Sequence, residues 1–268
     1  MTDIKIIKAI TKYVKSQPEL YKHFNNHYVT QKYSLQYILK NVLFIMRTGL
    51  PWRDLNRDLA IECSWNTIYK AYCKLIKLKI IKNTYIQLLQ KYFRRYKNRL
   101  KYRFSDTSTI TVKHGGEKAG YNKYAGRKKC CKLSLITDKR GIAYSVDIAK
   151  GNANDTPILE NQLKQKMLIE LPNNCIYFMA DKGYDSKALK TQLHKLQCSP
   201  LIPTNKRNTK YKQIQEMSKN EKRLFRLRIK IEHTFMKLKR ERRIATRYDR
   251  YVSNYIGFVF LGLMKLII

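Results

Sequence analysis

Three acidic residues, far apart in the chain, stand in positions where a carboxylate is unusual. Asp106 interrupts the segment RFSDTSTI, whose alternation is typical of a strand. A charge among apolar neighbours there is costly unless it is paired or bound to a metal ion. Asp181 follows the apolar run IYFMA, and Glu232 lies midway along a long basic segment. Because Mg²⁺ and Mn²⁺ prefer carboxylate oxygens, we predict that Asp106, Asp181 and Glu232 bind divalent metal ions.

The chemistry that such a site supports is phosphoryl transfer. Two Mg²⁺ or Mn²⁺ ions about 3.5–4 Å apart can activate a nucleophile, stabilise a leaving oxygen and neutralise the phosphate between them. A zinc site is not indicated, since His114, His194 and His233 are scattered and the 6 cysteines form no CxxC pair. We therefore predict structural roles for these histidines and reduced thiols for the cysteines.

The elements that must position these acids begin near residue 100. Alternating or apolar runs predict strands at 102–112, 131–137, 142–148, 175–180 and 199–203. Helical patterns cover 156–169, 186–196, 219–243 and 252–268. Three antiparallel strands followed by helix, strand, helix, strand and helix match the RNase H-like fold, an α/β class with a mixed sheet flanked by helices. Asp181 then lies at the carboxyl end of a central strand, where ligands gather in open α/β sheets.

Helical arithmetic on the segment 219–243 places Glu232 beside the apolar stripe. Phe225, Arg228, Glu232 and Lys239 share a strip about 60° wide at about 100° per residue. Two interpretations of Glu232 remain open. It is either a metal ligand at the edge of the core, or a surface acid in an ordinary intrahelical ion pair with Arg228.

The region before residue 99 is helical by pattern. The helical pattern from Ser34 to Thr48 stops at Gly49, residues 54–61 fit a short helix, and Ser64 caps a helix that runs to Leu78. Two short helices joined by a turn are compatible with a helix-turn-helix motif, in which Trp65 and Asn66 would begin the second helix. A small helical bundle with only a scaffold role would have the same sequence pattern. We predict a helical DNA-binding domain at 1–98 and a catalytic domain at 99–268.

The charge of the chain favours a polyanionic partner. There are 56 Lys and Arg against 19 Asp and Glu, for a net charge of +37. Such an excess is typical of nucleic-acid binding, with an anionic membrane surface as the alternative. Residues 113–132 hold seven Lys or Arg, including Arg127, Lys128 and Lys129, beside Tyr121 and Tyr124. We predict that this loop contacts DNA, although a solvated loop would have the same composition.

Neither end of the sequence predicts a membrane protein. Residues 1–17 form a charged amphipathic pattern and not a signal peptide. The apolar run 255–268 is too short to span a bilayer and includes Lys265, so we expect a buried closing helix and an intracellular protein.

Nearly the whole chain resembles the DDE transposases of bacterial insertion sequences, in the groups numbered four and five. SDTSTI is similar to the first catalytic strand of that family, ADKGYDS to its second-Asp motif, and GLPWRDL with SWNTIYKAY to its helical domain. The last motif of the family is Tyr, two residues, Arg, three residues, Glu, six residues and Lys. The same spacing is found here in Phe225, Arg228, Glu232 and Lys239. Phe225 in place of Tyr is the one visible departure.

The resemblance implies a specific mechanism. Asp106 would bridge two Mg²⁺ or Mn²⁺ ions, and Asp181 and Glu232 would each bind one of them. Arg228 and Lys239 would contact the backbone of the element ends. The protein would be a homodimer that acts on double-stranded DNA in the cytoplasm or nucleoid, with no membrane partner.

Two other functions remain open. A catalytically silent DNA-binding protein descended from a transposase is one, favoured by Phe225. A structure-specific nuclease that cuts but never joins is the other. Two further acids have two interpretations: Asp155 in GNANDTP is either a helix N-cap or support for the active site, and Asp185 is a helix cap more readily than a ligand.

Overall fold

The protein is described by a computed structural model that covers residues 2–25, 32–58, 62–96, 101–122, 126, 128–165, 167–169, 176–205 and 217–268. The chain forms two compact units. Unit 1 contains residues 1–89, 112–117 and 238–268, and unit 2 contains residues 90–111 and 118–237. The predicted division after residue 98 into a DNA-binding and a catalytic domain stays a prediction.

Unit 1 is built from helices. These are α1 (Thr2–Lys15), α2 (Pro18–Asn25), α4 (Leu35–Thr48), the short η1 (Trp52–Asp54) and α5 (Leu55–Asp58), α6 (Trp65–Lys77), the first part of α7 (Ile80–Tyr96), α12 (Arg242–Ala245) and α13 (Val252–Ile267), with the two-residue strand β7 (Thr246–Arg247). Two predicted helix ends are confirmed, the start of α6 at Ser64 and the end of α4 at Gly49. Ser64 Oγ accepts the N–H of Asn66, and Gly49 ends α4 with a φ of 72°.

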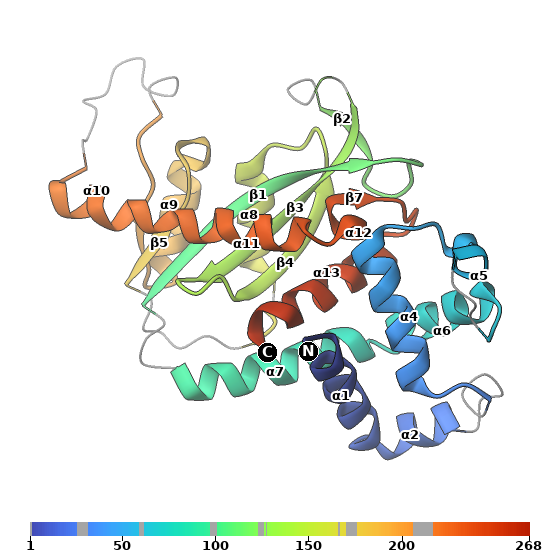
Figure 1. Cartoon of the computed structure of the whole chain (residues 1–268). Coiled ribbons are helices and arrows are strands. Elements are labelled where there is room, and N and C mark those ends of the chain that lie inside the picture. Colours follow the sequence, from blue (N-terminus) through green and yellow to red (C-terminus); the bar gives the residue numbers. More distant parts are fainter. Residues whose placement is uncertain are drawn as a thin grey trace. The chain divides into compact units, whose positions relative to one another are not determined.

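Helix α13, drawn in red in Figure 1, is largely apolar and belongs to unit 1. The predicted closing helix is confirmed as buried along most of its length, and it packs against α1, α6 and α12. Gly257 permits a close approach to α6, because a Cβ there would lie 2.2 Å from Ile76 Cδ1 and 2.6 Å from the Tyr72 hydroxyl. The Tyr72 hydroxyl in turn donates to the Asn254 carbonyl at 2.6 Å. Among the described residues, no helix combines the length and the apolar character needed to cross a bilayer.

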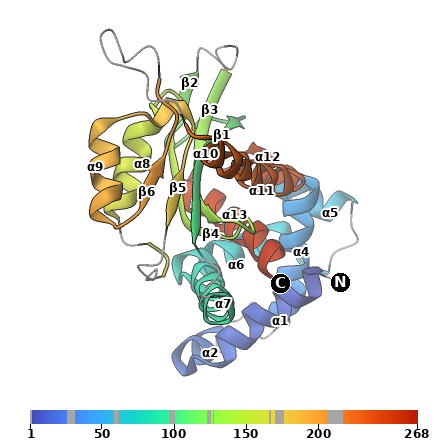
Figure 2. The same cartoon turned by 90° about the vertical axis from the view of Figure 1, so that its left-hand side faces the viewer.

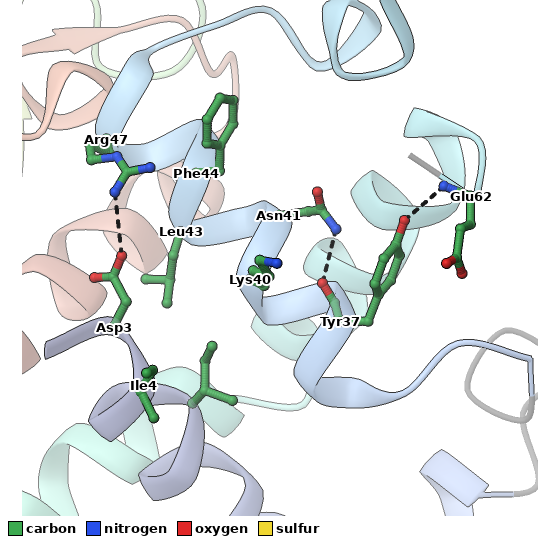
Figure 3. Close-up of a pocket in the computed structure, with 10 residues that line it drawn as sticks. Asp3, Ile4, Tyr37, Lys40, Asn41, Leu43, Phe44, Arg47 and Glu62 are labelled. Atoms are coloured by element: carbon green, nitrogen blue, oxygen red, sulfur yellow. Dashed lines mark hydrogen bonds and ion pairs between the residues drawn. The ribbon is translucent and has the colours of Figure 1, made fainter. Parts of the chain in front are cut away.

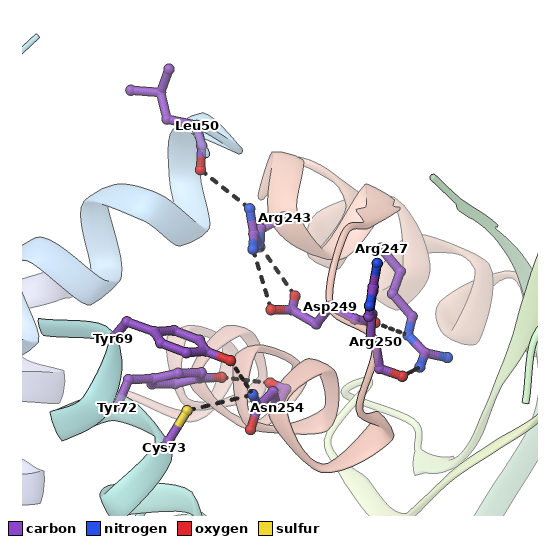
Figure 4. A network of polar contacts seen from close by, with 9 residues as sticks. All are labelled: Leu50, Tyr69, Tyr72, Cys73, Arg243, Arg247, Asp249, Arg250 and Asn254. Carbon is purple, nitrogen blue, oxygen red and sulfur yellow. Dashed lines mark hydrogen bonds and ion pairs between the residues drawn. The ribbon is translucent and has the colours of Figure 1, made fainter. Parts of the chain in front are cut away.

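Buried arginines tie the C-terminal segment of unit 1 together (Figure 4). Arg243 donates to both carboxylate oxygens of Asp249 at 3.2 Å and to the Leu50 carbonyl at 3.2 Å. Arg247, fully buried, donates to the carbonyls of Asp249, Glu117 and Arg250 at 2.7–2.8 Å. Because each charge has several partners, these arginines are part of the core and not free to bind an external ligand.

Unit 2 contains the mixed sheet. Its strands are β1 (Tyr102–Val112), β2 (Gly120–Asn122), β3 (Lys128–Asp138), β4 (Ala143–Lys150), β5 (Tyr177–Met179) and β6 (Ser199–Leu201). The order of neighbouring strands across the sheet is β2-β3-β1-β5-β6, and β4 also pairs with β3. Strand β1 runs antiparallel to β3 and parallel to β5, and β5 runs parallel to β6. This is the RNase H-like arrangement, so the predicted fold class is confirmed, while β2 lies in a segment predicted to be a loop.

Helices cover both faces of this sheet (Figure 2). One face packs on α8 (Asp155–Lys164) and α9 (Lys187–Lys195), through a core that includes Phe178, Leu159 and Leu189. The other face carries α10 (Lys219–Phe225), the 3-10 turn η6 (Arg226–Arg228) and α11 (Ile229–Lys239). The prediction of one continuous helix over 219–243 is therefore wrong, because the turn interrupts it at 226–228 and it ends at Lys239.

Helix α11 is anchored to the turn between β3 and β4. The Thr234 hydroxyl donates to the Gly141 carbonyl at 3.2 Å, and Gly141 has a φ of 81°. A Cβ at Gly141 would meet Thr234 Oγ1 at 2.2 Å, so only glycine allows this approach. The contact holds Glu232, which lies two residues before Thr234, at a set distance from the sheet.

Candidate active site

Asp106 is the acid that the sheet positions most firmly. Its neighbours Phe104 and Ser105 are fully buried, and its own side chain is 22% exposed. Oδ1 accepts the N–H of Thr107 at 2.9 Å, and Oδ2 accepts Arg228 Nη1 at 3.1 Å. Burial raises the pKa of the Asp106 carboxyl, the charge of Arg228 lowers it, and the charge of Asp181 raises it. The two acids are therefore close enough to repel each other.

The parallel pairing of β1 and β5 explains why Asp181 lies near Asp106. The register joins Phe104 to Met179, an offset of 179 − 104 = 75 residues, and Asp181 differs from Asp106 by the same 75. The backbone at Asp181 is extended, with φ −69° and ψ 164°. Since strand side chains alternate, residues that pair in register share a face, so Asp181 extends the row that contains Asp106.

Glu232 is connected to Asp106 by hydrogen bonds from the same arginine, Arg228. Arg228, on η6, donates to Glu232 Oε1 at 2.8 Å as well as to Asp106. The Arg228 guanidinium also lies 5.9 Å from the ring of Phe225. The intrahelical ion pair of Glu232 with Arg228 is confirmed, while the role of Glu232 as a metal ligand stays a prediction.

The donor set suits hard divalent cations, since all three acids offer carboxylate oxygens. Among the residues that the structure describes, no three His, Cys, Asp or Glu side chains converge closely enough to hold a metal ion together. The Arg228 guanidinium instead pairs with two of the three acids, Asp106 and Glu232.

A family model described as "Transposase DDE domain" matches residues 101–265, which is more than half of the chain. The chain belongs to this family of DDE transposases. A comparison with curated proteins found no match. A solved structure described as the crystal structure of the Mos1 strand transfer complex aligns at 11% identity over 76% of this chain and 78% of that one, with a TM-score of 0.27.

Asp155 of this transposase contacts the residue next to Asp106, in a role that differs from a helix cap. Helix α8 begins at Asp155 itself, with Asn154 as its N-cap, so the N-cap interpretation is wrong. Asp155 Oδ1 instead accepts the Thr107 hydroxyl and the Lys132 ammonium, each at 2.7 Å. Thr107 and Lys132 were missed as supporting residues, although a lysine inside an apolar strand is the same kind of signal that identified Asp106.

Asp185 is not the cap of the helix that follows it. Ser186 caps α9 by accepting the N–H of Leu189 at 3.3 Å. Asp185 accepts the N–H of Asn205 at 2.8 Å and the ammonium of Lys190 at 2.5 Å. It therefore fixes the loop after β6.

The residues predicted to contact DNA lie in several places. Lys128 and Lys129 are exposed on β3, and the Lys129 ammonium lies 5.7 Å from the ring of the exposed Tyr121. Arg127 falls outside the described residues. Lys239 ends α11 among the residues of unit 1, and burial lowers its pKa.

Trp65 and Asn66 begin α6 in unit 1. The Arg53 guanidinium lies 5.7 Å from the Trp65 ring, and Asn66 is exposed. The helix before α6 is a four-residue turn, α5, so the helix-turn-helix interpretation stays a prediction.

A pocket in unit 1 contains none of the predicted site residues (Figure 3). It lies between α1 and α4, where Arg47 faces Asp3 at 4.0 Å and the Tyr37 hydroxyl accepts the N–H of Glu62 at 3.0 Å.

Proposed function

We propose that this protein is an active DDE transposase that cuts phosphodiester bonds at the ends of a DNA element and joins the freed 3′-hydroxyls to target DNA. The proposal is supported by the contacts of Arg228, which donates to both Asp106 and Glu232. It is supported also by the register of β1 and β5, which, continued by two residues, aligns Asp181 with Asp106.

The reaction would proceed as two in-line displacements. In the first, a water oxygen attacks the phosphorus, the bond from phosphorus to the 3′-oxygen breaks, and that oxygen takes up a proton while the water gives one to solvent. In the second, the new 3′-hydroxyl attacks a target phosphate, and the target 3′-oxygen leaves. Two bound Mg²⁺ or Mn²⁺ ions would supply activation of the nucleophile and neutralisation of the phosphate.

The side chains of this chain supply binding and orientation. Asp106, Asp181 and Glu232 would hold the ions, as the chemistry of their oxygens allows. Arg228 would exchange its two carboxylate partners for a DNA phosphate, a group that a planar guanidinium can bind through two N–H groups at once. Lys128, Lys129, Arg127 and Lys239 would contact the backbone, and Trp65 with Asn66 would contact the element ends. A homodimer that brings two ends together and an intracellular location belong to the same proposal.

A cleavage and strand-transfer assay tests this function. Linear DNA that carries the ends of the element is incubated with the protein and Mg²⁺ or Mn²⁺. We expect nicks at the element ends and joined products. Binding without nicks would support the silent DNA-binding protein that Phe225 suggests, and nicks without joined products would support the structure-specific nuclease.

A further inference from the structure

Thr107 connects the first catalytic carboxylate to a second acid on the other side of the sheet. Its backbone N–H donates to Asp106 Oδ1 at 2.9 Å. Its side-chain hydroxyl donates to Asp155 Oδ1 at 2.7 Å. One residue therefore contacts both acids, one through the main chain and one through the side chain.

The pleat of β1 places the two acids on opposite faces. Side chains of consecutive strand residues point to opposite sides. Asp106 points toward the face where Arg228 and Glu232 lie, and Thr107 points toward α8, whose first residue is Asp155. The hydrogen-bonded connection from Asp155 to Asp106 runs through Thr107.

Lys132 completes this arrangement from the neighbouring strand. It pairs with Thr109 in the register of β1 and β3, so it shares the face of Thr107. Its side chain is 12% exposed, and its ammonium lies 2.7 Å from Asp155 Oδ1. The N-terminus of the ten-residue helix α8 also favours a negative charge at Asp155. Asp155 is thus held in place as an acceptor for the Thr107 hydroxyl.

Tyr184 is buried in the core that contains Phe178, Leu159 and Leu189. Burial raises the pKa of the Tyr184 phenol, and the charges of Asp155 and Asp106 raise it further.

We propose that Asp155 is a positioning residue for the metal-binding carboxylate Asp106, with the Thr107 hydroxyl as the connector. The inference rests on the proposed function and adds a residue to it. Loss of a hydrogen bond that orients a metal-binding carboxylate typically weakens metal affinity by about 10–100-fold. The Asp155 carboxylate fixes Thr107, and the Thr107 N–H fixes the direction in which Asp106 offers its oxygens.

Mn²⁺ affinity of the full-length protein, measured by electron paramagnetic resonance without DNA, tests the proposal. Thr107→Val keeps the shape of the side chain and removes its hydroxyl, and Asp155→Ala removes the acceptor. We expect each to raise the Mn²⁺ Kd about tenfold or more. The double variant should show the effect of one substitution and not of two, because both break the same contact. Thr107→Ser, which keeps the hydroxyl, should bind Mn²⁺ as the unaltered protein does.

Thr109→Val is the matched control, since Thr109 is exposed on the same strand and the same face. It should leave Mn²⁺ affinity unchanged. The proposal is overturned if Thr107→Val and Asp155→Ala, folded by circular dichroism, bind Mn²⁺ like the unaltered protein, or if Thr107→Ser loses as much affinity as Thr107→Val. If Asp106→Asn abolishes cleavage while those two variants bind normally, only this inference fails. If the unaltered protein neither binds Mn²⁺ nor cleaves, the proposed function fails and the inference falls with it.

Discussion

The guanidinium of Arg228 donates to Asp106 at 3.1 Å across 122 residues of sequence. The same group donates to Glu232 at 2.8 Å. A single cation thus neutralises the first and the third acid of the proposed active site. Any divalent ion that takes these oxygens must compete with it.

Arg228→Gln should therefore bind Mn²⁺ more tightly and DNA more weakly. Without the guanidinium, the repulsion between Asp106 and Glu232 is relieved only by the bound ion. We expect the Mn²⁺ Kd to fall about tenfold, equivalent to about 1.4 kcal/mol. The slope of DNA affinity against salt concentration should fall by about 1, as for the loss of one phosphate contact. Titration calorimetry and DNA binding at several salt concentrations measure the two effects.

Arg226→Gln is the control for this substitution, because Arg226 is an exposed arginine of the same 3-10 turn. It should leave Mn²⁺ affinity unchanged. Weaker Mn²⁺ binding by Arg228→Gln would show that Arg228 supports the ion site and does not compete with the ion.

Arg243→Gln should destabilise unit 1 strongly. Arg243 and Asp249 are each 4% exposed, and removal of one partner leaves a buried charge unpaired. Such a change typically costs about 3–5 kcal/mol. Arg47→Gln, which breaks the exposed pair with Asp3, should cost about 0–1 kcal/mol.

Urea unfolding followed by tryptophan fluorescence measures this difference, because both tryptophans, Trp52 and Trp65, lie in unit 1. Equal costs for Arg243→Gln and Arg47→Gln would contradict the burial of the Arg243–Asp249 pair.

The buried carboxyl of Asp138 should make the free energy of unfolding of unit 2 depend on pH. Burial raises the pKa of its carboxyl, against hydrogen bonds from the Tyr92 hydroxyl and the N–H groups of Arg140 and Ile142. The folded state therefore holds the proton to higher pH than the unfolded state does. The stability of the protein relative to Asp138→Asn should fall as pH rises from the usual carboxyl range through the raised pKa, and should be constant above it.

Urea unfolding of both proteins, followed by circular dichroism between about pH 3.5 and 8, covers the range from the usual Asp pKa upward. A stability difference that grows with pH would mean that hydrogen bonding to the ionised form outweighs the effect of burial.

The sequence predicts the acids of the site better than it predicts their partners. Asp106 and Asp181 are visible because each is a charge beside a short apolar run, and the order of strands then brings both to one place. The pairing of Arg228 with Asp106 depends on how α11 lies on the sheet, which no local pattern records. Asp155 resembled a helix cap because the segment NDTP precedes a helix, and only the fold places Thr107 and Lys132 against it.

The break in the long basic helix was missed for a physical reason. Residues 226–228 are Arg-Leu-Arg, without glycine or proline, and all of them favour a regular helix. The 3-10 turn there changes the direction in which Arg228 points, so arithmetic at a constant angle per residue could not predict its contact with Asp106. The short strand β2 was missed because its residues, Gly120 to Asn122, lie among loop-forming ones.

The most direct test of the central claim is metal-dependent cleavage of element-end DNA by the unaltered protein and by Asp106→Asn, Asp181→Asn and Glu232→Gln. The account predicts cleavage with Mg²⁺ or Mn²⁺ by the unaltered protein, and no cleavage by any of the three variants, each of which should still bind the DNA. Cleavage at the normal rate by any one of these variants would contradict the claim that its acid is an essential metal ligand.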